Sequence, residues 1–145
     1  MYLVDTNVIS TRAPARPAPA GFAAWMGAQG THLFLSAVTV AEIEDGIAKL
    51  RREGATRKSE TLSVWLETVL HLYSDRILVF DVPTARVAGT LSDRARGQGQ
   101  APGWGDIIIA ATAARHGLTI LSRNVKHFVP LGVSVLDPFV TPLPA

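Results

Sequence analysis

The sequence predicts an α/β fold: three layers, α/β/α, with a parallel sheet of roughly five strands between two layers of helices. Short apolar runs alternate along the chain with longer stretches in which apolar residues recur at helical spacing. The chain has 145 residues, 48% of them hydrophobic, which suits one domain with a full core. Since no internal repeat interrupts this order, we expect a single domain over residues 1–145.

Each element follows from its local pattern. The short apolar runs predict strands, in chain order, at residues 1–5, 32–36, 77–80, 118–121 and 133–136. Apolar residues three and four positions apart predict helices at residues 21–29, 39–52, 57–73, 83–96 and 104–116, and a short helical turn near 125–128.

Capping residues and breakers set the expected boundaries. Thr39 and Glu42 have the spacing of a capping box, which predicts a helix start at Thr39. Pro83 suits a first helical turn, and Gly117 suits a helix C-terminus. Three prolines make residues 12–20 an expected loop, and the glycines of residues 97–103 predict a flexible connection.

Bulk properties narrow the class of protein. No apolar run has the length of a membrane span, and the N-terminus lacks the pattern of a signal peptide. Cys is absent, as is common in a reducing cytoplasm, where we expect the protein to be. The net charge of +2 and the pI of about 9.4 lean only weakly toward polyanionic partners.

The most informative residues are four polar side chains, each at a junction between a strand and a helix: Asp5, Glu42, Asp106 and Asn124. In a parallel sheet these junctions lie at one edge, where open α/β sheets bind ligands. Each acid alone has a structural explanation, as a turn former, a capping partner or a residue that favours a helix N-terminus. Together, three carboxylates would repel one another without a cation, which predicts a site for a hard divalent ion, first of all Mg²⁺.

Other site chemistries find less support. The four histidines, His32, His71, His116 and His127, show no ligand spacing for zinc and are expected at the surface or half-buried. Neither a phosphate-binding P-loop nor a serine nucleophile elbow is present. Mg²⁺ held by carboxylates suits hydrolysis of phosphodiesters.

Four segments resemble the PIN-domain ribonucleases of the VapC type, toxins of bacterial toxin–antitoxin pairs, and are most similar to the FitB-like branch. The segments are LVDTNVIS at residues 3–10, LSAVTVAEI at 35–43, GDIIIAATA at 105–113 and LSRNVKHF at 121–128. The resemblance implies a PIN-like fold and cleavage of RNA by a bacterial endoribonuclease that depends on Mg²⁺ or Mn²⁺.

Site roles follow from the same resemblance. It implies that Asp5 and Asp106 bind the metal and that Glu42 binds it directly or through water and helps to activate the attacking water. Thr6, Asn7 and Ser122 would orient these carboxylates, and Arg123 and Lys126 beside Asn124 are candidates for RNA phosphate contacts. Many family members carry a fourth acid at position 124 or 127, where this chain has Asn and His, so we expect one tightly held ion.

Expected partners are the RNA substrate, a second copy of the chain and a small antitoxin that blocks the site, in a heterotetramer or larger complex that contacts promoter DNA only through the antitoxin. Trp25 and Trp65 are candidate interface anchors, with core packing as the alternative.

Two other functions stay open. A phosphatase of the haloacid dehalogenase type would use Asp5 as nucleophile but should have an acid at Asn7, and a non-catalytic dimer would use the acid pocket only for docking.

Overall fold

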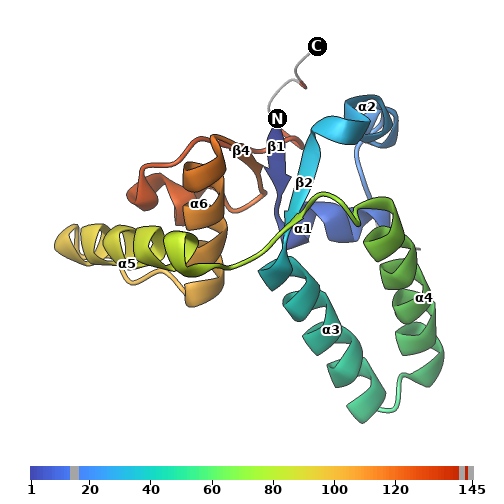
Figure 1. Ribbon diagram of the computed structural model, residues 1–145. Coiled ribbons are helices and arrows are strands. Elements are labelled where there is room, and N and C mark those ends of the chain that lie inside the picture. The colour runs from blue at the N-terminus through green and yellow to red at the C-terminus, as the bar shows by residue number, and fades with distance from the viewer. Residues whose placement is uncertain (14–16, 141–142, 144–145) are drawn as a thin grey trace.

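The computed structural model describes residues 1–13, 17–140 and 143 and confirms the predicted fold class (Figure 1). Five strands form one sheet in the order β3-β2-β1-β4-β5, and every described pair is parallel. The strands are β1 (Tyr2–Val4), β2 (Leu33–Ser36), β3 (Ile77–Leu78), β4 (Thr119–Leu121) and β5 (Val135–Leu136). Because the strands are parallel, their carboxyl ends lie at a common edge.

Helices form a layer on each side of this sheet. One layer contains α1 (Thr6–Ile9), α2 (Phe22–Gln29), α3 (Ala37–Arg52) and α4 (Thr56–Leu72), with α3 and α4 as a long hairpin in Figure 1. The other contains α5 (Val82–Gly97), α6 (Trp104–His116) and α7 (Val125–Phe128). Short 3₁₀ turns, η1 (Ser10–Arg12), η2 (Gly30–His32) and η3 (Val129–Leu131), complete the described elements.

Alternation along the strands divides the core into two clusters. In β1, Leu3 packs with α5, α6 and α7, whereas Val4 packs with α1 to α4. Both side chains are fully buried, and each burial contributes roughly 1.5–3 kcal/mol. Because Leu3 and Val4 are anchored in both layers of the core, the position of Asp5, the next residue, is fixed relative to the helices on both sides. Within the described part of the chain, no helix is both long and apolar enough to cross a membrane.

The start of α3 differs from the prediction. The helix begins at Ala37, because the Ser36 hydroxyl already accepts a hydrogen bond from the Val38 amide and serves as N-cap. Thr39 is therefore a buried residue of the first turn, and Glu42 lies in the second turn. The predicted capping box is wrong, and Glu42 has no capping role.

Other boundaries shifted by less. Strand β3 ends two residues early, because this edge strand pairs only through Ile77 and Leu78, and β4 and β5 begin one and two residues late. Helix α1 and turn η1 were missed. Of the loop expected at 12–20, residues 14–16 lie outside the described residues, and 17–19 have no regular structure. Confirmed details include the span of α6, Pro83 in the first turn of α5 and Gly117 as a left-handed C-cap with φ of 65°.

Candidate active site

Asp5 directly follows β1 and is the N-cap of α1. Its backbone amide donates to the carbonyl of Leu121 on β4 at 2.9 Å, which ties it to the centre of the sheet. Its Oδ1 accepts from the Thr6 amide at 2.8 Å, so the carboxylate caps α1. With only 5% of its surface exposed, Asp5 is a buried acid, and such an acid needs specific partners.

Ser122 is the main partner. Its buried hydroxyl donates to Asp5 Oδ2 at 2.7 Å and accepts from Asn7 Nδ2 at 3.4 Å and from the Asn124 amide at 3.0 Å. Asn7 Oδ1 in turn accepts from the Arg123 amide at 3.1 Å. The end of β4 and the start of α1 are thereby joined through side chains that hold the Asp5 carboxylate in one orientation.

Glu42 approaches the same edge from α3. The Thr6 hydroxyl lies 3.1 Å from Glu42 Oε1 and donates to it, and it also lies 3.3 Å from the hydroxyl of the buried Thr39. A Cβ added to Gly105, at the start of α6, would lie 3.8 Å from Glu42 Oε1. This is an ordinary van der Waals distance, so the first turn of α6 lies close to the carboxylate and a methyl group at position 105 would just touch it.

Asp106 points to a residue that sequence reasoning did not assign to the site. Its Oδ2 lies 3.0 Å from Nδ1 of His127, the third residue of α7. Both side chains are partly exposed, at 28% and 44%. His127 is near the surface as expected, but it belongs to the site. The spacing in the sequence could have indicated that His127 belongs to the site. Position 127 follows Asn124 by three residues, so on a helix it lies nearly one turn further on.

The acids influence one another's ionisation. Burial is the main cause that raises the pKa of Asp5, with Asp106 adding to it, while hydrogen bonds from Ser122 and Thr6 and the nearby His127 oppose it. Partial desolvation likewise raises the pKa of Glu42, the Thr6 hydroxyl opposes it, and the charges of Asp5 and Asp106 add to it. Three carboxylates from β1, α3 and α6 thus share one electrostatic environment.

These oxygen ligands fit a hard divalent cation in their chemistry. The carboxylates would have to move to coordinate an ion together. Among the described residues, no group of three acidic or histidine side chains is close enough together to hold a metal. Glu42 is engaged by Thr6 and Asp106 by His127, so binding would draw both carboxylates toward Asp5.

Comparison with known proteins shows which family the chain belongs to. A family model described as PIN domain matches residues 2–128. The chain belongs to the PIN domain family. It is 37% identical over 142 residues to "Toxin FitB" of Neisseria gonorrhoeae, covering 96% of this chain and 99% of that protein. It is also 36% identical over 141 residues to "VapC ribonuclease Y4jK" of Sinorhizobium fredii, covering 96% and 98%.

Solved structures of other proteins show the same architecture. The crystal structure of FitAcB from Neisseria gonorrhoeae superimposes with a TM-score of 0.84 at 37% identity, covering 97% of this chain and all of that one. VapBC2 from Rickettsia felis, bound to promoter DNA, has a TM-score of 0.77 at 20% identity, which shows likeness of fold. The family match also argues against the phosphatase alternative.

The remaining predicted site residues of this PIN domain differ in their surroundings. The guanidinium of Arg123 lies over the ring of Phe139, 4.7 Å from its centroid. Lys126 lines a small pocket together with Asp106 and His127. The Asn124 side chain makes no hydrogen bond within the described residues, and only its backbone joins the network around Ser122.

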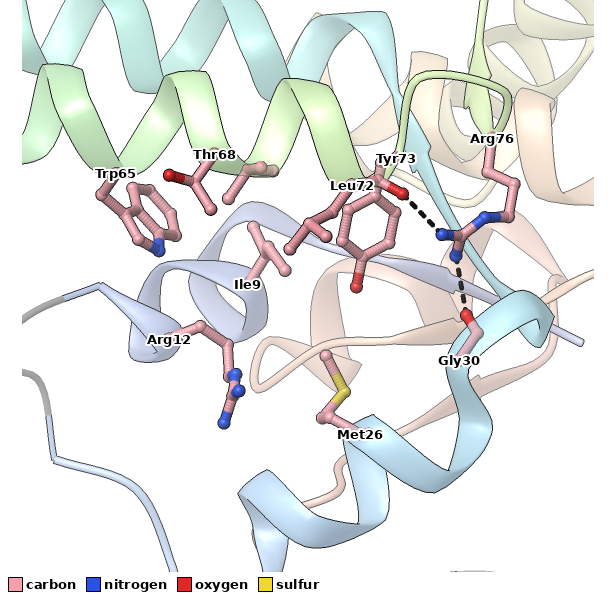
Figure 2. A pocket seen from close by; sticks show the side chains of 11 residues that line it. Ile9, Arg12, Met26, Gly30, Trp65, Thr68, Leu72, Tyr73 and Arg76 are labelled. Atoms are coloured by element: carbon pink, nitrogen blue, oxygen red, sulfur yellow. Dashed lines mark hydrogen bonds between the residues drawn. The ribbon is translucent and has the colours of Figure 1, made fainter.

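Apolar hollows flank α4. Figure 2 shows one of them, with a volume of about 450 Å³, between Trp65 of α4, Tyr73 directly after α4 and Met26 of α2. Arg76 closes one end by donating to the carbonyls of Gly30 and Leu72, both at 2.7 Å. A second hollow of about 300 Å³ extends between α3 and α4 from Trp65 to Thr6, beside the acids. Trp25 packs edge-on against Tyr2.

Proposed function

We propose that this protein is a metal-dependent endoribonuclease and the toxin of a type II toxin–antitoxin system, acting in the bacterial cytoplasm. The observation that carries the proposal is the buried Asp5 carboxylate, oriented by Thr6 and Ser122 and electrostatically coupled to Glu42 and Asp106. Keeping such a group ionised is costly without a cation, so the arrangement makes physical sense as a metal site. The ribonuclease name of the Sinorhizobium relative supports RNA as substrate.

Asp5, Asp106 and Glu42 would hold Mg²⁺ or Mn²⁺. A cation bound there supplies Lewis acidity toward a phosphodiester and lowers the pKa of a bound water. Ser122 and Thr6 keep the Asp5 oxygens aimed at the site, with Asn7 and the Asn124 backbone holding Ser122. Glu42, held at the edge of the acid group by the Thr6 hydroxyl, would serve as the base. It would accept a proton from the attacking water as the water oxygen bonds to phosphorus and the bond from phosphorus to the leaving ribose oxygen breaks, with the leaving oxygen protonated from solvent.

Cations on α7 and just before it complete the site. Lys126 lines a pocket together with Asp106, and Arg123 directly follows Ser122, which supports both as candidates for contacts to RNA phosphates. Residues 107–136 contain no acidic side chain, so this side of the site is the one that attracts a polyanion.

Partners belong to the same proposal. The FitAcB complex superimposes over the whole of its matched chain, which supports a small antitoxin as partner of this protein. The hollow from Trp65 to Thr6 leads to the acids and suits a blocking segment of that antitoxin. We propose a homodimer that joins the antitoxin in a heterotetramer or larger complex, with promoter DNA contacted only by the antitoxin and with Trp25 and Trp65 as candidate anchors.

Cleavage of a labelled single-stranded RNA by antitoxin-free protein tests the proposal. Reactions with Mg²⁺, with Mn²⁺ and with EDTA are run beside Asp5→Asn and beside Asp81→Asn, a matched change at the N-cap of α5. We expect cleavage that needs metal, disappears in Asp5→Asn and persists in Asp81→Asn. A protein that binds its antitoxin but neither holds Mg²⁺ in calorimetry nor cuts any RNA would be a docking module instead.

A further inference from the structure

A second cavity borders the acid site and is not needed for the chemistry proposed above. It lies between the loop that precedes α6 and the helix α7, and it shares Asp106 and His127 with the site. The loop side contributes Gln100 and Pro102, and the α7 side contributes Lys126 and Pro130. A ligand in this pocket would therefore touch the same Asp106 side chain that faces the reacting phosphate.

The size of the pocket suits part of a longer ligand. Its volume of about 240 Å³ is below the roughly 300–1,000 Å³ of pockets that enclose a free small molecule. It therefore has room for a single nucleotide unit of a strand that continues outside.

The chemistry of the walls is that of a nucleotide site. Lys126 has no ion-pair partner within the described residues and can neutralise a phosphate. Gln100 offers an amide that both donates and accepts, as the edge of a base requires. Pro102 and Pro130 supply apolar surface for the base itself.

Charge also favours this direction for the strand. Residues 107–136, which include α7, contain no acidic side chain that would repel a phosphate. The α7 side carries Lys126 and His127. An RNA strand whose phosphate lies at the acids is thus drawn across the pocket.

We propose that this pocket is a specificity subsite of the proposed ribonuclease, which holds the nucleotide next to the cleaved bond, with Gln100 reading its base and Lys126 binding its phosphate. This inference rests on the proposed function. Gln100 and Lys126 act by contact with the substrate and have no part in activating water.

Two measurements test the subsite. Cleavage products from an RNA pool with randomised sequence are sequenced for the wild type, Gln100→Ala and Gln98→Ala, a matched change on the same loop outside the pocket lining. We expect Gln100→Ala to shift the nucleotide preference beside the cleaved bond by roughly 2- to 10-fold, the effect of one hydrogen bond, and Gln98→Ala to leave it unchanged. Should Gln100→Ala lower thermal stability, Gln100→Glu repeats the test with a side chain of the same shape.

The second measurement is independent of cleavage. Binding of a short single-stranded RNA to Asp5→Asn protein is followed against salt, with Lys126→Ala or Arg86→Ala added; Arg86 is an exposed residue of α5 outside the pocket lining. Loss of one phosphate contact should reduce the slope of log K against log salt by roughly 0.7 for Lys126→Ala, with no change for Arg86→Ala. If the wild type cleaves but the pocket variants match their controls in both measurements, the subsite is refuted and the nuclease stands. Absence of both metal-dependent cleavage and RNA binding would refute both.

Discussion

Replacing Asp5 by Asn should abolish cleavage yet leave the folded protein nearly as stable at neutral pH. Asparagine keeps an oxygen that can accept from the Thr6 amide. Its amide group, however, faces a Ser122 hydroxyl that already accepts from Asn7 and from the Asn124 amide. A hydroxyl oxygen has two lone pairs, so one hydrogen bond is lost, at a cost of about 0.5–1.5 kcal/mol.

The lost bond is opposed by relief of a buried charge. The pKa of Asp5 is raised mainly by burial, so the fold favours the protonated carboxyl over the ionised one. A group of this kind contributes its full stability below its ordinary pKa of 3.8, and that contribution is lost as pH rises through the folded pKa. The Asn variant does not titrate, so its stability relative to wild type should improve as pH rises from below 3.8 toward neutrality.

Urea unfolding across that pH range, combined with the RNA assay, measures both effects. At neutral pH we expect the unfolding free energy of Asp5→Asn to lie within about 1 kcal/mol of wild type. Cleavage should fall at least about 100-fold, since loss of a residue that merely supports a metal ligand costs 10- to 100-fold.

Asp81→Asn is a control in which stability should change with pH in the opposite direction. Hydrogen bonds from Thr84 lower the pKa of Asp81, so this variant should lose stability relative to wild type as pH rises, and it should retain cleavage. An Asp5→Asn variant that becomes progressively less stable than wild type toward neutral pH would refute the reasoning.

Three further changes separate chemistry from stability. Glu42→Gln should lose cleavage while its urea midpoint stays close to wild type, since Ser36 caps α3; a rate within about threefold of wild type would contradict its catalytic role. Ser122→Ala should lower the unfolding free energy in urea by roughly 1–3 kcal/mol, because it removes a buried hydrogen-bond donor to Asp5. It should also weaken Mg²⁺ binding in calorimetry. Unchanged metal affinity would argue against the role of Ser122 in orienting Asp5. Gly105→Ala should fold normally, because its methyl group would meet Glu42 Oε1 at an ordinary 3.8 Å, yet slow cleavage by limiting movement of that carboxylate; wild-type kinetics would show that Glu42 needs no such freedom.

Local patterns predicted the helices well where the signals were strong. The span of α6 follows from its apolar run and from Gly117, which ends it in a left-handed conformation. At α3 the local pattern predicted a start at Thr39, whereas Ser36 is the N-cap in the structure. The strand end at Ser36 decided the outcome, because the helix starts directly where pairing with β3 stops.

The sequence by itself determined the α/β class and the parallel sheet, since hydrophobic periodicity is a local property. Its prediction that all three acids lie at strand–helix junctions holds only for Asp5, because Glu42 lies in the second turn of α3 and Asp106 lies in the first turn of α6, which follows α5. Thr6, Asn7 and Ser122 were expected to orient these acids from the family resemblance, whereas the tertiary structure alone brought His127 to Asp106. Ser122 meets Asp5 across 117 positions of sequence, and His127 meets Asp106 across 21. Such contacts depend on strand order and on the angle at which each helix leaves the sheet, and these are set by packing of the whole core rather than by any local pattern.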